Sequence, residues 1–446
     1  MFQTLKKAWG VPEIRKKILY TLFMIIVFRF GCAVAVPFLN TDVVKSWMDA
    51  SGANNGGFLD YMNTITGGAM SQATMFSLSI TPFINASIIM QLLTYALPPL
   101  ERMRDEGEEG RKKIDKITAF VAMVLAVVMS YGYYLILKNR AHVENENGIT
   151  YALKYSSGGE GVFAAFVIIA CFVAGALIVV WMGNRISDKG LGNGISVLLF
   201  AGIAARFPTD AALLVKLTKD NPSKYLFVSL GYLLFIIFEI AFIVFMNEAE
   251  RRIPIQYAKR VVGRKQYGGQ KTHIPIKVIM SGVMPIIFAM SFMSLPQTIE
   301  LFAGEPKKAS GFYYHFVKFF STRGWGYATI YFLLIIAFNY FYVSIQYNPV
   351  EIANNLRPSN GGIPGIRPGK PTSDYIQRVL NKISLVGAIF LGFIAVIPIF
   401  MGMADKQLQA RSMGGTTILI AVSVALETTR PRESHLMMRH HKGFLQ

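Results

Sequence analysis

The sequence is poor in charge for its length. Only 16% of its 446 residues are charged, whereas an ordinary soluble domain has about 25%. A soluble chain of this size needs a well-charged surface, which this one cannot supply. Hydrophobic residues make up 53% and aromatic residues 13%, and this content excludes intrinsic disorder. The composition therefore indicates a polytopic membrane protein.

Cysteine and catalytic motifs are also scarce. The two cysteines, Cys32 and Cys171, both fall inside apolar runs, which excludes a disulfide scaffold, C-x-x-C redox chemistry and cysteine zinc sites. The six histidines all lie between or after the apolar runs, and no H-E-x-x-H, Walker or G-x-S-x-G pattern occurs. We therefore expect no catalytic residue, no metal and no cofactor.

Ten apolar stretches come close to the length of about 20 residues that crosses a bilayer. Basic residues precede the first stretch and no cleavage site follows it, so we expect a retained helix rather than a removed signal peptide. The second and fifth stretches are too polar to face lipid and are expected to line an internal path. The expected spans are residues 18–38, 72–97, 117–137, 162–183, 194–217, 225–247, 277–297, 325–347, 382–402 and 413–429.

Lysine and arginine gather on one side of this arrangement. Ten spans put both termini on the same side, and that side carries 30 basic residues against 14 on the other. By the positive-inside rule both termini are expected to be cytoplasmic.

Two cytoplasmic loops, residues 248–277 and 348–382, are longer than a helix connection requires. In the first, Ile253, Ile255 and Tyr257 alternate with polar residues, which predicts a β-hairpin. Its basic side chains would suit RNA phosphate or an acidic protein partner. The positive-inside rule alone would also explain them, so both interpretations stay open.

The two halves of the chain resemble each other. Pro82-x-Ile84-x-Ala86 in the second span matches Pro285-x-Ile287-x-Ala289 in the seventh, and glycines begin both the fifth and the tenth span. With five spans in each half, the halves must enter the membrane in opposite senses. An inverted repeat of this kind predicts a central pathway lined by the second, fifth, seventh and tenth spans.

Six apolar residues of these four spans form a candidate constriction. Two pairs of them are four residues apart, so each pair shares one helix face. If all six face inward, they block ions by dewetting and offer no polar grip to a passing chain. Such residues otherwise serve as packing or lipid-facing groups. The six are Ile84, Ile88, Ile195, Leu199, Ile287 and Ile420.

Two ionisable side chains, Arg29 in the first expected span and Glu239 in the sixth, stand at membrane depth. Such residues are usually retained for a reason, although Arg29 could simply bond backbone carbonyls of a neighbouring span. A secondary transporter with an inverted repeat is the alternative function, but it would need a polar substrate site with ion-binding groups. A membrane-embedded enzyme would need a nucleophile with its base, or a metal set, and neither is found.

Six segments of unusual composition lead to a known family. They are SITPFINASIIMQLL (79–93), ISDKGLGNGIS (186–196), RRIPIQYAKRV (251–261), THIPIKV (272–278), GGIPGIRPGKPT (361–372) and RHHKGF (439–444). They resemble the SecY family, the central subunit of the bacterial protein-conducting channel, and the resemblance covers nearly the whole chain.

The resemblance implies an all-α polytopic membrane protein with ten transmembrane helices, in two inverted five-helix halves around a central hourglass pore. Residues 1–217 and 218–429 would be the halves, and 430–446 a cytoplasmic tail. The six candidate residues stand where the family has its pore ring. A plug at about residues 56–68 would seal the resting pore, with Phe58, Leu59, Tyr61, Met62 and Ile65.

The implied function is passive conduction of unfolded secretory polypeptides across the bacterial cytoplasmic membrane, and release of transmembrane segments sideways into the bilayer. A signal sequence would open a lateral gate between the second and seventh spans, with Asn85, Gln91 and Ser291 as its polar contacts. The implied partners are SecE, SecG, the SecA motor, the ribosome and a membrane insertase. The docking candidates are Arg251, Arg252, Lys259, Arg260, Arg367 and Lys370.

Overall fold

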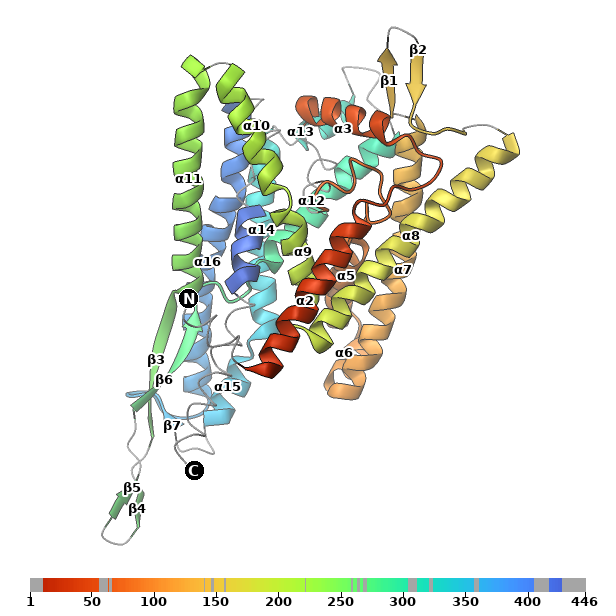
Figure 1. The fold of residues 1–446 in the computed structure, drawn as a ribbon. Coiled ribbons are helices and arrows are strands. Elements are labelled where there is room, and N and C mark those ends of the chain that lie inside the picture. Colours follow the sequence, from red (N-terminus) through yellow and green to blue (C-terminus); the bar gives the residue numbers. More distant parts are fainter. Residues whose placement is uncertain are drawn as a thin grey trace.

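Figure 1 shows the chain as a computed structural model that consists mostly of helices. The structure describes residues 11–55, 63, 66–139, 141–145, 148–155, 158–220, 222–257, 260–262, 265–267, 271–303, 311–320, 324–356, 361–404 and 417–426.

The first half of the chain, red through yellow to light green in Figure 1, contains one small hairpin among its described helices. Its helices are α2 (Pro12–Gly31), α3 (Thr41–Asn55), α5 (Thr81–Ala96), α6 (Pro98–Asp105), α7 (Glu108–Asn139), α8 (Gly158–Lys189), α9 (Gly194–Ala204) and α10 (Phe207–Asp220). The hairpin pairs β1 (His142–Asn145) with β2 (Gly148–Tyr151). Helix α7 packs against α5 and α8, and α8 also contacts α2 and α9.

The second half, green to blue, carries most of the strands. Its helices are α11 (Pro222–Glu248), α12 (Met284–Ala303), α13 (Phe312–Phe319), α14 (Trp325–Gln346), α15 (Pro349–Leu356), α16 (Lys370–Ala404) and a last one at Thr417–Leu426. Its strands are β3 (Glu250–Tyr257), β4 (Arg260–Val262), β5 (Lys265–Tyr267), β6 (Lys271–Lys277) and β7 (Gly361–Gly362). Helix α14 packs between α12 and α16.

Every expected span coincides with at least part of a helix. Within the described ranges, 5 helices are long and apolar enough to cross a membrane by themselves, and 6 if α5 and α6, bent by 97°, form one span. Large apolar side chains are exposed on outward helix faces, among them Phe23, Phe166 and Phe227. In water such exposure would be unfavourable, whereas in a bilayer these residues face lipid.

The second expected span begins later than predicted. Residues 66–80 form a buried series of turns, and the helix begins only at Thr81. In this segment the hydroxyls of Ser71, Thr74 and Ser77 donate to nearby backbone carbonyls. Bonds of this kind compete with a helix, and the sequence prediction of a helix from residue 72 did not allow for them.

The fifth expected span is interrupted, and the seventh begins later than predicted. Helix α9 ends at Ala204 and α10 begins at Phe207, so residues 194–217 are not one helix. Residues 278–283 lie between β6 and α12 without helical structure, and Gly282 there has a φ of 59°. A left-handed residue ends regular helix geometry, so the predicted start at 277 is too early.

The predicted hairpin in residues 248–277 is confirmed. Strands β3 and β6 are antiparallel, with Ile253 opposite Ile274. Ile253 and Ile255 are buried, as the alternation predicted. Strand β3 also pairs with β7, with Gln256 opposite Gly362, so the two long loops form one sheet.

Two glycines let non-helical segments lie against long helices. A Cβ on Gly175 of α8 would overlap the carbonyl oxygen of Met75, in the turns before α5. A Cβ on Gly387 of α16 would come within 2.5 Å of the carbonyl oxygen of Val278, in the segment before α12. The helices α5 and α12 are therefore preceded by equivalent close approaches, one in each half.

Candidate functional site

The six candidate ring residues come from four helices. Ile84 and Ile88 lie on α5, Ile195 and Leu199 on α9, Ile287 on α12 and Ile420 on the last helix. All six are buried or half-buried. Proline occupies the first turn of both α5 and α12, where its missing N–H costs nothing, and in each helix the ring residue follows two positions later.

These residues meet in one continuous apolar region. Ile88, Ile287 and Ile420 belong to the same hydrophobic cluster, which joins α5 to the second half of the chain. Leu199 belongs to a second cluster with α2 and α8, and Ile195 packs against it. Ile84 packs against both clusters, so it connects them. The six residues thus belong to, or pack against, two apolar clusters that Ile84 connects.

A polar contact crosses from α5 to α12 beside this region. The Ser291 hydroxyl Oγ donates a hydrogen bond of 3.1 Å to the Asn85 side-chain oxygen Oδ1. Gln91, the third predicted contact, is half-buried further along α5, and the described residues offer no hydrogen bond to its side chain. The structure therefore brings together two of the three.

Aromatic residues that the sequence analysis did not single out extend the α5 contact to α14. The rings of Tyr95 and Phe341 are 6.2 Å apart, edge to face. The Arg104 guanidinium lies over the Tyr95 ring at 4.7 Å. Tyr95 and Phe341 are far apart in the sequence, and no sequence pattern predicts that their rings meet.

The expected plug residues Phe58, Leu59, Tyr61, Met62 and Ile65 lie outside the described residues. One described residue among them, Asn63, accepts a 2.9 Å bond at its side-chain oxygen from the backbone N–H of Ser71. Thr66 is fully buried. This stretch enters the interior beside the ring helices.

Gly67 shows how closely that stretch passes between α2 and α9. Its φ is 67°, and a Cβ there would lie 2.6 Å from the carbonyl oxygen of Gly202 and 2.8 Å from Nη1 of Arg29. Arg29 Nη1 is buried and has no hydrogen-bond partner among the described residues. The expectation that Arg29 bonds backbone carbonyls is thus not met by this atom.

The docking candidates of the first loop lie on the hairpin. Arg251 and Arg252 are exposed on β3, and Arg252 Nε donates a 2.7 Å bond to Glu250 Oε1. Arg260 lies in β4, and Lys259 lies outside the described residues.

The candidates of the second loop, Arg367 and Lys370, are exposed where the loop enters α16. The Thr372 hydroxyl donates a 2.8 Å bond to the Arg367 carbonyl, which shapes this entry. Because β7 of this loop pairs with β3, the structure brings both sets of basic residues onto one projection. In the described ranges, no group of three or more His, Cys, Asp or Glu is placed to hold a metal.

Comparison with known proteins gives consistent matches along the chain. The family model SecY matches residues 74–429. The chain is 38% identical to the protein translocase subunit SecY of Streptomyces galbus, with all of both chains covered. It is also 38% identical to that of Mycobacterium tuberculosis, with 97% of each chain covered.

Solved structures agree in fold. A protein-conducting channel superposes with a TM-score of 0.66 at 18% identity, over 96% of each chain. Sec61 from a canine ribosome–channel complex superposes with a TM-score of 0.62 at 16% identity, again over 96% of each chain.

Proposed function

The chain belongs to the SecY family of protein translocase subunits, and we propose that its constriction is the apolar region formed by the six ring residues. It is a membrane channel subunit for the translocation of protein. The observation that carries the proposal is that Ile84 packs against the apolar cluster that contains Ile287 and Ile420. Branched apolar side chains exclude hydrated ions by dewetting, yet they give an unfolded chain nothing to bind.

We propose the helices α5 and α12 as the two walls of a lateral gate. Asn85 and Ser291 form a hydrogen bond between them, and Ile88 of α5 belongs to the same apolar cluster as Ile287 of α12. A signal sequence is itself an apolar helix, so it can insert between the walls and replace these contacts with its own. Opening is then a population shift that needs no chemistry in this chain.

A thiol cross-link across this seam tests the function. In a background with Cys32→Ala and Cys171→Ala, we expect the double variant Asn85→Cys/Ser291→Cys to stop translocating a secretory reporter when it is oxidised. The reason is that a covalent bond prevents the walls from separating, and a reductant should restore the rate. The measurement is reporter protection from protease in proteoliposomes that contain the assembled complex. Each single-cysteine variant is the control, and a fully cross-linked channel that still translocates contradicts the gate.

We propose residues 1–217 and 218–429 as two inverted halves. The matching approaches of Met75 to Gly175 and of Val278 to Gly387 support this division, because each joins corresponding elements of the two halves. The position of residues 56–68 in the family supports their role as a plug. The bond from Ser71 to Asn63 and the close approach at Gly67 support a plug whose C-terminal end is attached beside α2 and α9.

We propose that the projection formed by the two long loops docks the ribosome and the SecA motor. Four exposed basic residues support this proposal, because pairing of β3 with β7 joins the two loops that carry them. They are Arg251, Arg252, Arg367 and Lys370. In the same proposal SecE, SecG and an insertase are membrane partners, the membrane is the bacterial cytoplasmic membrane, and both termini are cytoplasmic. Energy would come from the motor or the ribosome.

Reversing the charge of Arg367 tests the docking proposal without disturbing the fold. We expect Arg367→Glu to reduce motor-dependent secretion at least severalfold, because a positive contact becomes repulsive. The variant protein should still insert into the membrane at normal levels, since Arg367 is exposed. Secretion rates equal to those of the parent would contradict docking at this loop.

A further inference from the structure

A buried side chain of α2 holds the turn that leads into α9, the helix that carries two of the ring residues. The Thr21 hydroxyl accepts a 3.1 Å bond from the backbone N–H of Leu191 and donates a 2.9 Å bond to the Lys17 carbonyl. A hydroxyl has one proton, so the Lys17 bond directs that proton into α2 and leaves the oxygen free to accept from Leu191. Thr21 and Leu191 are both buried. The turn at residues 190–193 is therefore fixed to α2.

The anchored turn determines where α9 begins. The Asn193 side-chain oxygen accepts a 3.1 Å bond from the backbone N–H of Ile195, as an N-cap residue does. Three residues lie between the anchored N–H of Leu191 and the ring residue Ile195, and the last of them, Gly194, already belongs to α9. The connection is too short to absorb a displacement, so a shift of the turn moves Ile195 with it.

Helix α8 supports the same start of α9. The Ser187 hydroxyl accepts a 2.9 Å bond from the N–H of Gly194. A Cβ on Gly194 would overlap the Gly183 carbonyl, and a Cβ on Gly183 would lie 3.1 Å from Cγ1 of Ile195. Helix α2 contacts both α8 and α9 and lies beside them in Figure 1. The start of α9 is therefore held by α2 and α8 together.

We propose that Thr21 is a positioning residue of the constriction, an inference that rests on the proposed role of the six ring residues. Its hydroxyl holds the turn, and the turn holds Ile195 and Leu199 at the constriction. An apolar constriction blocks ions only while its side chains leave no path that water can fill. Loss of the bond from Leu191 leaves a buried N–H without its acceptor, so the turn shifts toward another partner and opens such a path.

Ion conductance of the resting channel, recorded with the assembled complex in planar bilayers, tests the proposal. Thr21→Val keeps the shape of the side chain and removes the hydroxyl, and we expect a conductance severalfold above that of the parent. Thr21→Ser keeps the hydroxyl and should match the parent. A role of Thr21 in apolar packing alone would give the opposite order, because serine lacks the methyl group that valine retains.

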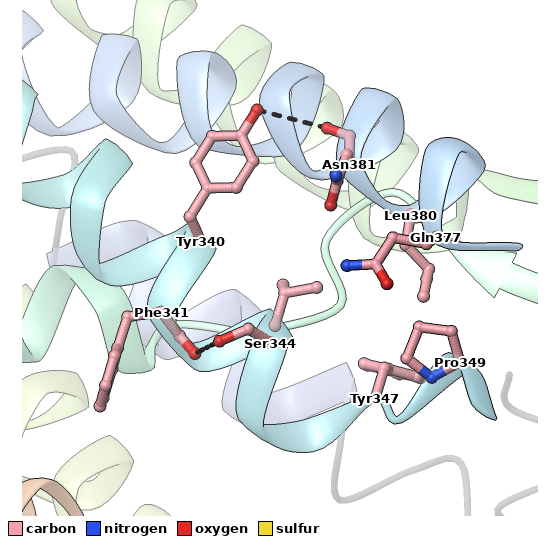
Figure 2. A pocket seen from close by; sticks show the side chains of 9 residues that line it. Tyr340, Phe341, Ser344, Tyr347, Pro349, Gln377, Leu380 and Asn381 are labelled. Carbon is pink, nitrogen blue, oxygen red and sulfur yellow. Dashed lines mark hydrogen bonds between the residues drawn. The ribbon is translucent and has the colours of Figure 1, made fainter. Parts of the chain in front are cut away.

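Tyr340→Phe is the matched control. The Tyr340 hydroxyl also joins two helices, because it donates a 3.3 Å bond from α14 to the Asn381 carbonyl of α16 (Figure 2). Neither of these helices carries a ring residue, so Tyr340→Phe should leave the channel closed.

A second measurement uses native membranes and needs no purified complex. In a background with Cys32→Ala and Cys171→Ala, a membrane-impermeant maleimide should label Ile195→Cys severalfold faster when Thr21→Val is also present. The reason is that the shifted turn lets water reach this side chain. An unchanged labelling rate contradicts the proposal.

The variant Ile195→Asn separates this inference from the ring itself. If Ile195→Asn conducts ions and Thr21→Val stays at the parent level, Thr21 does not position the ring although the ring stands. If neither variant conducts, the ring fails and this inference fails with it. Equal leaks from Thr21→Val and Thr21→Ser also overturn the proposal, because the leak would not depend on the hydroxyl. An equal leak from Tyr340→Phe does so as well, because loss of any bond between helices would then suffice.

Discussion

The two proposed gate walls are alike in how they begin and different in what anchors them. Before α5, the hydroxyls of the turn segment bond to that segment's own backbone, and Ala73 and Ser79 take positive φ values of 44° and 47°. Its described side-chain bond from outside is from the Tyr133 hydroxyl of α7 to the Met70 carbonyl, at 2.7 Å.

The segment before α12 is anchored by side chains of its neighbours. Ser281 donates to the Asn339 side-chain oxygen, and Asn339 Nδ2 donates to the carbonyl and hydroxyl of Ser384 at 3.0 and 2.9 Å. All three residues are buried. This network joins α12 to α14 and α16, so we infer that these three helices move as one body. The segment before α5 is held instead by backbone hydrogen bonds, both its own and those that join Met75 to Val34 and Val36 to Ala73.

The largest loss of stability is expected at the two glycines, Gly175 and Gly387, against which the segments before the two walls pack. Gly175→Ala should lower the thermal stability of the purified complex most, because the added methyl overlaps the Met75 carbonyl and backbone must shift. Overpacking of this kind costs about 1–3 kcal/mol. Gly387→Ala should cost less, since its methyl stops 2.5 Å from the Val278 carbonyl. Thermal melting followed by size-exclusion chromatography measures both.

Gly231→Ala is the matched control. It also lies inside a long helix, α11, but nothing is within 4 Å of its Cβ position. Alanine is favoured over glycine in a helix interior by up to about 1 kcal/mol, so this variant should be neutral or more stable. If all three variants melt alike, the close approaches do not hold the two segments in place.

A smaller effect is expected where the walls differ. Asn339→Ala removes both ends of the buried network and leaves the Ser281 hydroxyl to find another acceptor. Polar contacts inside membrane proteins average roughly 0.6 kcal/mol, so we expect a loss of about 2 kcal/mol for the three bonds. Asn339→Asp is a second variant, which keeps the acceptor for Ser281 and loses the donor to Ser384. A melting curve identical to that of the parent for Asn339→Ala would show that the network does not couple α12 to α14.

The sequence predicts much of this arrangement, for identifiable reasons. Long apolar runs locate the helices, and the alternation around Ile253 predicts the hairpin, because both follow from local periodicity. Interruptions at residues 66–80 and 278–283 were missed. In residues 66–80, hydroxyl groups bond to the backbone and compete with a helix. In residues 278–283, the left-handed Gly282 prevents a helix although the sequence is apolar.

Contacts between distant segments are the harder part. The pairing of Asn85 with Ser291 followed from the family resemblance, whereas Asn339 with Ser281, Tyr95 with Phe341, and Arg29 with Gly67 carry no local signal. Each depends on how helices far apart in sequence cross. The strand β7 was missed for the same reason, since its partner β3 is about a hundred residues away.

The ring is the central claim, and ion conductance of the resting channel tests it most directly. Single-channel recording in planar bilayers should show a clear ion leak for Ile84→Asn and Ile287→Asn, because a polar side chain lets water wet the constriction. Ile89→Asn is the matched control. Ile89 is on α5 beside the ring residue Ile88, but its side chain is 40% exposed, so this variant should leave the channel closed. Conductance at the parent level in both ring variants would contradict the account.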